Sequence, residues 1–301
     1  MNPETAGVRW NKVTLVGVGL LGGSLGLALK RRGLAKLVVG YVRRRASVAE
    51  CAKAGAVNRA TVHLLDAAAD ADLIVLCTPI AQMKGLVEQL LPALKRGVII
   101  TDVGSVKGSV VKELESLIAR AGAHFVGSHP MAGAEKTGVA AARADLFEKA
   151  VCVVTPTRQT NSPALRKVNQ LWKAVGCRLL TLTPAAHDEL VSRSSHLPHV
   201  VAAELANLVL HPGYPKAQPM LCANGFRDTT RIASGSPEMW RDIALANRQN
   251  LSRALDVFMG DLRKLQRALK QGDTAAIARF FELAKQRRDE WSRQARSPSP
   301  E

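Results

Sequence analysis

Residues 13–24 read V-T-L-V-G-V-G-L-L-G-G-S, and this stretch decides the fold. Four apolar or β-branched residues run directly into a glycine-rich turn, and a helical run from Gly23 to Arg32 follows. Strand, tight turn and helix start are the context that a dinucleotide-binding G-x-G-x-x-G motif requires. We expect Gly17 to allow the turn, Gly19 to let a pyrophosphate approach the backbone, and Gly22 to let helix and strand pack closely.

The free N–H groups at the start of this helix, around Leu20 and Leu21, are expected to hold the phosphates, because the helix dipole favours an anion there. An ordinary glycine-rich loop is the alternative, and the second strand predicted at residues 37–41 favours the nucleotide site. We assign Thr78 and Pro79, at the end of a buried strand predicted over residues 72–78, to the same cofactor site.

The end of the second strand bears on the choice of cofactor. Folds that bind NAD usually carry an acidic residue there, which binds the ribose 2′-hydroxyl. This chain instead has Val42 followed by Arg43, Arg44 and Arg45. Arginines attract a 2′-phosphate, so we expect NADP in preference to NAD, with Arg43 and Arg44 in the site. The alternative is that these arginines are simply exposed and NAD binds without its usual acidic partner.

Bulk composition excludes several classes of protein. The net charge of +17 is spread over many helices and aromatic residues make up only 4% of the chain, so a solvated basic surface is favoured over a nucleic-acid site. No apolar run approaches the ~20 residues that span a bilayer, and we see no secretory signal. Five scattered cysteines without a C-x-x-C pair favour reduced thiols in a cytoplasm and argue against a zinc knuckle.

Strands alternate with helices up to residue 183, which predicts an α/β, Rossmann-type, doubly wound and mostly parallel sheet over residues 1–183. Ligands bind beyond the carboxyl ends of the strands in such sheets, and Ser105 and His129 fall just past two of them. The first 11 residues are expected to be a disordered lead. The predicted strands cover 13–16, 37–41, 72–78, 98–103, 124–126, 150–155 and 178–183, and the helices cover 23–32, 48–54, 82–94, a segment ending at 121, and 163–175.

After Pro184 the strand signals stop, which predicts an all-helical domain over residues 184–301 that completes its core by forming a homodimer. The apolar segment 197–210 is too short for a membrane and is expected to be buried. A single long helix is predicted over residues 243–269, with a leucine-rich stripe suited to helix packing, and Gly272-Asp273 breaks it. Further helices are predicted at 187–194 and 274–291, followed by a disordered tail at 297–301.

Four stretches combine polar residues with Gly or Pro: D-V-G-S-V-K at 102–107, S-H-P-M-A-G at 128–133, S-H-L-P-H at 195–199 and G-F-R-D-T-T-R at 225–231. With the glycine motif they occur in the order typical of one family. From residue 13 to about residue 291, the chain resembles the prephenate/arogenate dehydrogenases of tyrosine biosynthesis. With no chorismate mutase segment before the nucleotide domain and no sizeable regulatory extension after the helices, we expect the monofunctional form.

The resemblance implies that NAD(P)+ takes a hydride from the ring hydroxyl carbon of prephenate or arogenate while a base takes the proton, and that loss of CO2 then leaves an aromatic ring. His129 matches the family's catalytic histidine, and a neutral imidazole suits this task. Ser105 matches a serine that binds the substrate hydroxyl or orients His129. The substrate-binding positions are matched by His199, His196, Arg231, Trp240 and Arg227.

Each assignment has a structural alternative. Ser105 could be a turn or helix-capping serine, Arg231 could pair with Asp228, and Trp240 could be core packing. Lys107, a secondary candidate for anion binding, could only neutralise Asp102. The histidine pair 196 and 199 lacks a third ligand at a convincing spacing, so we expect no metal.

Two other functions compete with this one. The first is another two-domain oxidoreductase, such as a β-hydroxyacid dehydrogenase, which would leave the S-H-P-M-A-G and S-H-L-P-H motifs unexplained. The second is a non-enzymatic nucleotide sensor or nucleic-acid-binding protein, which would not require His129 and Ser105. The choice between prephenate and arogenate and any feedback inhibition by tyrosine are open at this point.

Overall fold

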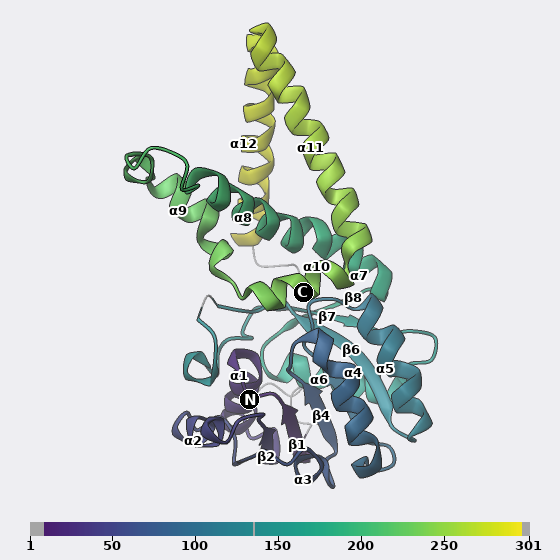
Figure 1. Ribbon diagram of the computed structural model, residues 1–301. Helices are drawn as coiled ribbons and strands as arrows, with labels where there is room; N and C mark the ends of the chain where they lie inside the picture. The colour runs from purple at the N-terminus through teal and green to yellow at the C-terminus, as the bar shows by residue number, and fades with distance from the viewer. Residues whose placement is uncertain (1–8, 135, 297–301) are drawn as a thin grey trace. The chain divides into compact units, whose positions relative to one another are not determined.

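The computed structural model describes residues 9–134 and 136–296. Within them, eight strands form one sheet in the order β3-β2-β1-β4-β5-β6-β7-β8, and every neighbouring pair is parallel except β6 with β7 (Figure 1). The doubly wound, mostly parallel α/β class is therefore confirmed. The strands are β1 (Trp10–Val16), β2 (Ala35–Tyr41), β3 (Arg59–Thr61), β4 (Leu73–Leu76), β5 (Ile99–Asp102), β6 (His124–Pro130), β7 (Val151–Thr155) and β8 (Arg178–Thr181).

Helices cover both faces of this sheet. One face packs against α1, α2 and α6, around buried side chains such as Leu25 and Trp172. The other packs against α3, α4 and α5, around Met83 and Leu114. These helices are α1 (Leu20–Arg31), α2 (Arg45–Lys53), α3 (Leu64–Ala68), α4 (Ile80–Leu90), α5 (Gly108–Arg120) and α6 (Ser162–Ala174), with short 3-10 turns at η2 (Leu91–Ala93) and η3 (Val139–Ala141).

After β8 the chain is helical. The segments are α7 (Pro184–Val191), the π-helical turn η4 (Ser192–His196), α8 (Leu197–Val209), the 3-10 turn η5 (Gln218–Leu221), α9 (Asn224–Thr230), the 3-10 turn η6 (Arg231–Ser234), α10 (Pro237–Ala246), α11 (Arg248–Gln271) and α12 (Thr274–Arg296). None of the helices in the described residues is long and apolar enough to cross a membrane.

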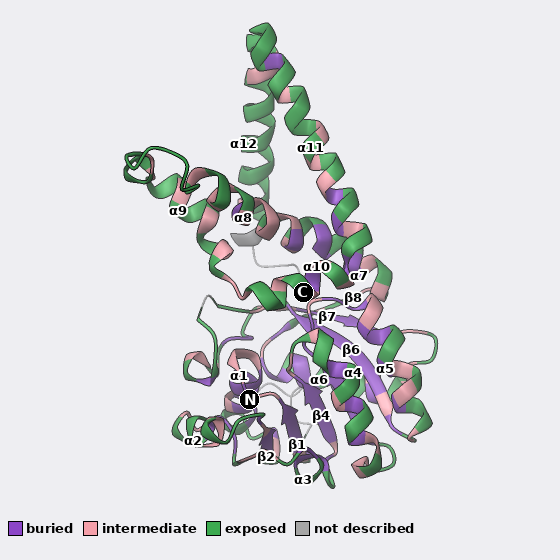
Figure 2. Cartoon of the chain, in the orientation of Figure 1, coloured by how far each residue is buried: buried purple, intermediate pink, exposed green. Residues whose placement is uncertain are grey.

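The chain divides into two compact units, residues 1–248 and 249–301. The second unit consists of α11 and α12, which meet at the predicted break, where Gly272 has φ of 66°. Figure 2 shows that the strands of the first unit are largely buried, whereas α12 is largely exposed.

The structure corrects several element boundaries. Trp10 and Asn11 belong to β1 rather than to a disordered lead; residues 1–8, like the tail 297–301, lie outside the described residues. β3 and α3 were not predicted, because neither five-residue α3 nor three-residue β3 is long enough to show a periodicity. Asn247 interrupts the helix expected over 243–269 and separates α10 from α11.

The prediction that the apolar helix at 197–210 is buried is wrong for this chain by itself. Only Ala202 of α8 is buried, and Leu208 and Leu210 are 53% and 48% exposed. Apolar composition alone does not tell whether a helix is covered by its own chain or by another surface.

Strand β6 changes its partner part-way along its length, and this places His129. Residues 124–126 pair in parallel with β5, whereas residues 127–130 pair antiparallel with β7. His129 therefore lies within a strand, not in a loop after one as predicted, but beyond the part of β6 that continues the parallel sheet.

Candidate active site

The glycine turn has the local geometry of a phosphate cradle. Gly17 has φ of 96°, and a Cβ there would lie 2.9 Å from Thr78 Cγ2. A Cβ at Gly22 would lie 2.1 Å from the Gly17 carbonyl oxygen, so only glycine lets α1 pack this closely against the turn. Around Gly19, by contrast, no described atom beyond its two neighbours in the chain lies within 4 Å of a Cβ position. The backbone at Gly19 is thus open to a ligand.

The start of α1 suits an anion. Gly19 is its N-cap and provides no side-chain hydrogen bond, and no acidic residue stands in the first turn, which contains Leu20 and Leu21. Unpaired N–H groups at a helix start attract a phosphate. Beside them, the Thr78 hydroxyl at the end of β4 is buried and has no hydrogen-bond partner among the described residues, and Pro79 caps α4. These residues fit a dinucleotide between β1 and β4, where the sheet reverses its strand order.

The arginines after β2 are fully on the surface. Val42 is 5% exposed, and Arg43, Arg44 and Arg45 are all exposed. Arg44 is the N-cap residue of α2, and its guanidinium lies 3.5 Å from the Ser47 hydroxyl.

His129 is buried, and its Nδ1 faces a second histidine. Its side chain is 8% exposed, and Nδ1 lies 2.8 Å from Nε2 of His187. Burial lowers the pKa of His129 well below 6.5, and His187, Lys107 and His196 lower it further. The imidazole is therefore neutral at neutral pH, which a base requires.

A buried ion pair holds β6 beside β5. The Lys107 ammonium pairs with the Asp102 carboxylate, and both side chains have no exposed surface. Lys107 Nζ also donates to the Ser128 carbonyl at 2.9 Å, and Asp102 accepts from the N–H of Ser128 at 3.1 Å and of Gly104 at 2.8 Å. In the structure, Lys107 therefore neutralises Asp102.

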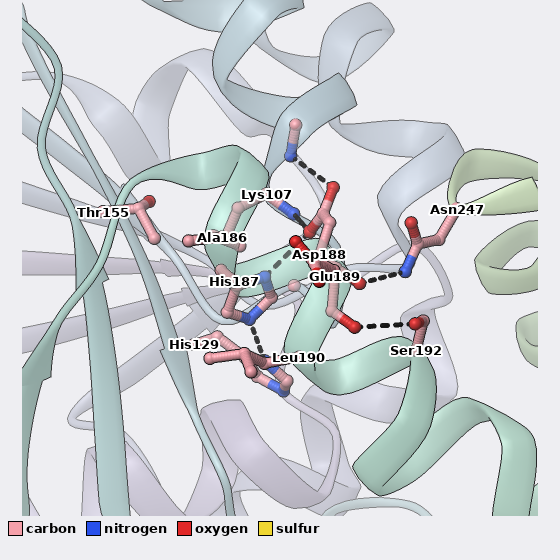
Figure 3. Close-up of polar contacts among 12 residues, drawn as sticks. Lys107, His129, Thr155, Ala186, His187, Asp188, Glu189, Leu190, Ser192 and Asn247 are labelled. Atoms are coloured by element: carbon pink, nitrogen blue, oxygen red, sulfur yellow. Dashed lines mark hydrogen bonds and ion pairs between the residues drawn. The ribbon is translucent and has the colours of Figure 1, made fainter. Parts of the chain in front are cut away.

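The helix start of α5 receives its cap from another helix. Lys107, its N-cap residue, makes no capping hydrogen bond with its own side chain. Instead Asp188 of α7 accepts the N–H of Lys107 at 2.7 Å and that of Gly108 at 2.8 Å (Figure 3). A Cβ on Gly108 would lie 2.7 Å from Asp188 Oδ2, so glycine lets the carboxylate approach. The same carboxylate lies 2.8 Å from Nδ1 of His187.

His196 is held at the end of the π-helical turn. Its residue exposure is 1%, and the Asn247 side-chain amide donates both to the Asp188 carbonyl at 2.8 Å and to Nδ1 of His196 at 3.2 Å. Because Nδ1 accepts, the proton of the neutral ring lies on Nε2. Nε2 is buried and makes no well-aligned hydrogen bond among the described residues. Burial lowers the pKa of His196 to about 4, although the backbone of Ser105 acts on this ring and raises its pKa.

The remaining substrate-binding candidates lie on the following helices. Trp240 of α10 stacks on His199 with ring centroids 3.7 Å apart, and it meets His196 edge-on at 6.1 Å. Arg227 of α9 and Arg231 of η6 are exposed. The structure thus brings three of the five candidates into one aromatic cluster and leaves the two arginines on the surface.

Sequence reasoning missed three residues of this site: His187, Asp188 and Asn247. None belongs to a motif, and each contacts a residue at least 51 positions away in the sequence. His129 Nδ1 faces His187. Two signals were present in the sequence: a His-Asp pair in the first turns of a helix, and an Asn inside an expected helix.

Family models decide the family. Residues 25–181 match the model described as prephenate dehydrogenase, nucleotide-binding domain, and residues 183–283 match that described as prephenate dehydrogenase, dimerization domain. The chain belongs to the prephenate dehydrogenase family. Within this family it is 35% identical to prephenate dehydrogenase of Bacillus subtilis (strain 168), over 92% of this chain and 75% of that protein. It is 34% identical to cyclohexadienyl dehydrogenase of Zymomonas mobilis, over 92% of this chain and 94% of that one.

A solved structure of the same family has the same fold. Prephenate dehydrogenase from A. aeolicus, in complex with hydroxyphenyl propionate and NAD+, is 31% identical, with a TM-score of 0.88 over 94% of this chain and 99% of that one. Family membership accounts for the two histidine motifs, which a β-hydroxyacid dehydrogenase would leave unexplained.

Proposed function

We propose that this protein catalyses the oxidative decarboxylation of prephenate or arogenate, with hydride transfer to NAD(P)+, in tyrosine biosynthesis. The observation that carries the proposal is a buried, neutral His129 at the carboxyl edge of the sheet. At the same edge, the glycine turn between β1 and α1 has the geometry of a phosphate cradle. Membership of the prephenate dehydrogenase family supports the proposal. We assign residues 1–183 to nucleotide binding and residues 184–301 to substrate binding and dimerisation.

His129 acts as the base in this proposal. Its Nε2 takes the proton of the ring hydroxyl as the carbon loses a hydride, and Ser105 binds the same hydroxyl. The bound nicotinamide ring supplies the hydride acceptor. Loss of CO2 from the resulting dienone leaves its electron pair in the ring, and the phenolic oxygen takes the proton back from His129. Proton and charge therefore balance without a further acid.

The helical segments bind the substrate in this proposal. Arg231, helped by Arg227, binds a carboxylate through a planar guanidinium. His199, stacked on Trp240, presents a ring to the substrate side chain, and His196 presents a buried Nε2–H donor. No side chain in this set distinguishes a keto acid from an amino acid, so both substrates are kept.

A steady-state assay tests this function directly. Prephenate and arogenate are each offered with NAD+ and with NADP+, and reduced nicotinamide is followed. Turnover of either ring substrate supports the proposal. Nucleotide binding without turnover of either ring substrate contradicts it.

We further propose that NADP is preferred over NAD, because exposed Arg43 and Arg44 stand where an acidic residue would bind the ribose of NAD. Replacing both arginines by alanine should raise KM for NADP+ by about 10- to 100-fold, the loss of one or two charge-assisted hydrogen bonds. KM for NAD+ should change little. Arg31→Ala, at the end of α1, is the matched surface control. A wild type that prefers NAD+ would overturn this assignment.

The pH profile should report the environment of His129. Because burial holds its pKa well below 6.5, the base stays deprotonated as the pH falls through the ordinary histidine range. The value of kcat/KM for the ring substrate should therefore be level from about pH 8 to about pH 6.5 and decline only at lower pH. A decline centred at or above the ordinary histidine pKa would contradict a buried neutral base.

We also propose a cytoplasmic homodimer. Five free cysteines fit a reducing compartment. Apolar surface for a second copy is offered by Leu208 of α8, by Leu210 just after it and by Trp291 of α12, each about half exposed or more. Light scattering should give twice the chain mass of 32.3 kDa; a monomer at micromolar concentration would contradict this.

A further inference from the structure

We propose that His187, held by Asp188, is a positioning residue that fixes His129 in the tautomer with a free lone pair on Nε2 and stabilises the imidazolium formed during turnover. The inference rests on the proposed role of His129 as the base. Figure 3 shows the three side chains in line, His129 from β6 and the other two from α7.

Asp188 determines which ring nitrogen donates in each of these hydrogen bonds. Its carboxylate accepts two backbone N–H groups, from Lys107 at 2.7 Å and Gly108 at 2.8 Å. A carboxylate has no hydrogen to donate and can only accept. Nδ1 of His187, 2.8 Å from Asp188 Oδ1, must therefore carry a proton.

That proton sets the tautomer of the next ring. A neutral His187 protonated on Nδ1 has its lone pair on Nε2, which lies 2.8 Å from His129 Nδ1. His129 must then donate from Nδ1, and its own Nε2 is left with the lone pair. The opposite tautomer of His129 would place a proton on the atom that has to accept one.

The same chain of contacts stabilises the protonated state. His187 has no exposed surface and His129 is 8% exposed, so an imidazolium there has little water to solvate it. A positively charged His187, Lys107 and His196 each oppose a positive charge on His129, whereas a His187 that is neutral opposes none and accepts the hydrogen bond. The ammonium of Lys107 is in addition paired with Asp102. The hydrogen bond through His187 connects the imidazolium to the Asp188 carboxylate. The reaction requires this state, because the proton has to be held until the phenolic oxygen takes it back.

The tautomers can be read in the wild-type protein without any loss of folding. The chain has seven histidines, so uniform 15N-histidine labelling gives a small set of ring spectra at neutral pH, and His129→Asn and His187→Gln spectra assign the two rings. We expect both rings in the Nδ1–H form. A His129 in the Nε2–H form overturns the proposal whatever the enzyme turns over.

Kinetics separate positioning from a purely structural role. His187→Ala should lower kcat/KM by about 100-fold, part of what a general base contributes. It should also shift the acidic limb of the pH profile to lower pH, because the His129 imidazolium loses the hydrogen bond that stabilises it. His187→Gln should recover part of the activity, because its amide oxygen can accept from His129 Nδ1. His124, at the other end of β6, is half-buried, and His124→Ala is the matched control. It should leave kcat/KM and the pH profile unchanged.

A double variant gives the decisive comparison. If His187 acts only through His129, the His129→Asn/His187→Ala protein should be no slower than His129→Asn alone. An additive loss, or a His187→Ala enzyme with the wild-type rate or pH profile, overturns the proposal. Failure of the wild type to turn over any ring substrate would instead refute the proposed function, and the 15N spectrum would still test the tautomer.

Discussion

Replacing His129 by asparagine is expected to lower kcat/KM for the ring substrate by about 10³- to 10⁴-fold, the upper part of the range for losing a general base. An asparagine amide can still reach Nε2 of His187, so the strand and its hydrogen bond are retained while the proton acceptor is lost. The loss should appear in kcat, because base catalysis acts on the chemical step. Steady-state assays with saturating nucleotide measure it.

The control for this variant lies on the same strand. His124→Asn changes the same residue type at the first position of β6, where the side chain is half-buried, and should leave kcat/KM unchanged. Nucleotide binding by His129→Asn should match the wild type, since the phosphate cradle lies at β1. A His129→Asn enzyme within about tenfold of the wild-type rate would remove His129 from the chemistry.

The second large effect is on stability. Lys107→Met should lower the free energy of unfolding by about 3–5 kcal/mol, because it leaves the Asp102 carboxylate buried without its counter-ion. The Ser128 carbonyl would lose a donor as well. Urea denaturation followed by circular dichroism measures the change as a lower transition midpoint.

An exposed ion pair provides the comparison. Lys264 pairs with Asp261 at 2.7 Å on the surface of α11, with side chains more than half exposed, so Lys264→Met should barely move the midpoint. Equal midpoints for Lys107→Met and the wild type would show that the buried pair does not hold β5 and β6 together.

The parts of the site that could be predicted from sequence are those with local causes. Gly17 is needed because the tight turn requires a positive φ. The sequence pattern of a strand, a run of glycines and a helix predicts such a turn from about a dozen residues. His129 was found because its motif resembles that of a family. Even there, the local sequence suggested a loop, since Pro130 and Gly133 are typical of turns, whereas pairing with β7 extends the strand to Pro130.

The parts that could not be predicted depend on distant contacts. In the sequence, Asp188 looks like an ordinary helix residue. It caps α5 only because α7 packs against the start of α5, which lies 80 positions earlier in the chain. Asn247 looks like one more polar position in a long helix until its amide is seen to donate to both His196 and the Asp188 carbonyl. Local propensity carries no information on such contacts.

These contacts also explain how the helical segment takes part in the chemistry. Asp188 joins α7 to the start of α5, and α5 follows directly from the loop that carries Ser105. The carboxylate that caps this helix is the same group that orients His187. In our proposal, the docking of the helices and the orientation of His129 therefore depend on one side chain, that of Asp188.

The most direct measurement follows CO2 and reduced nicotinamide together. Prephenate and arogenate, each labelled with 13C in the ring carboxyl group, are mixed separately with purified wild-type protein and NADP+ or NAD+, and both products are quantified over time. With the substrate that is turned over, we expect one labelled CO2 for each reduced nicotinamide, and both rates should be suppressed in His129→Asn. Reduction of nicotinamide without release of CO2, or no reduction with prephenate or arogenate despite bound nucleotide, would contradict the proposed function.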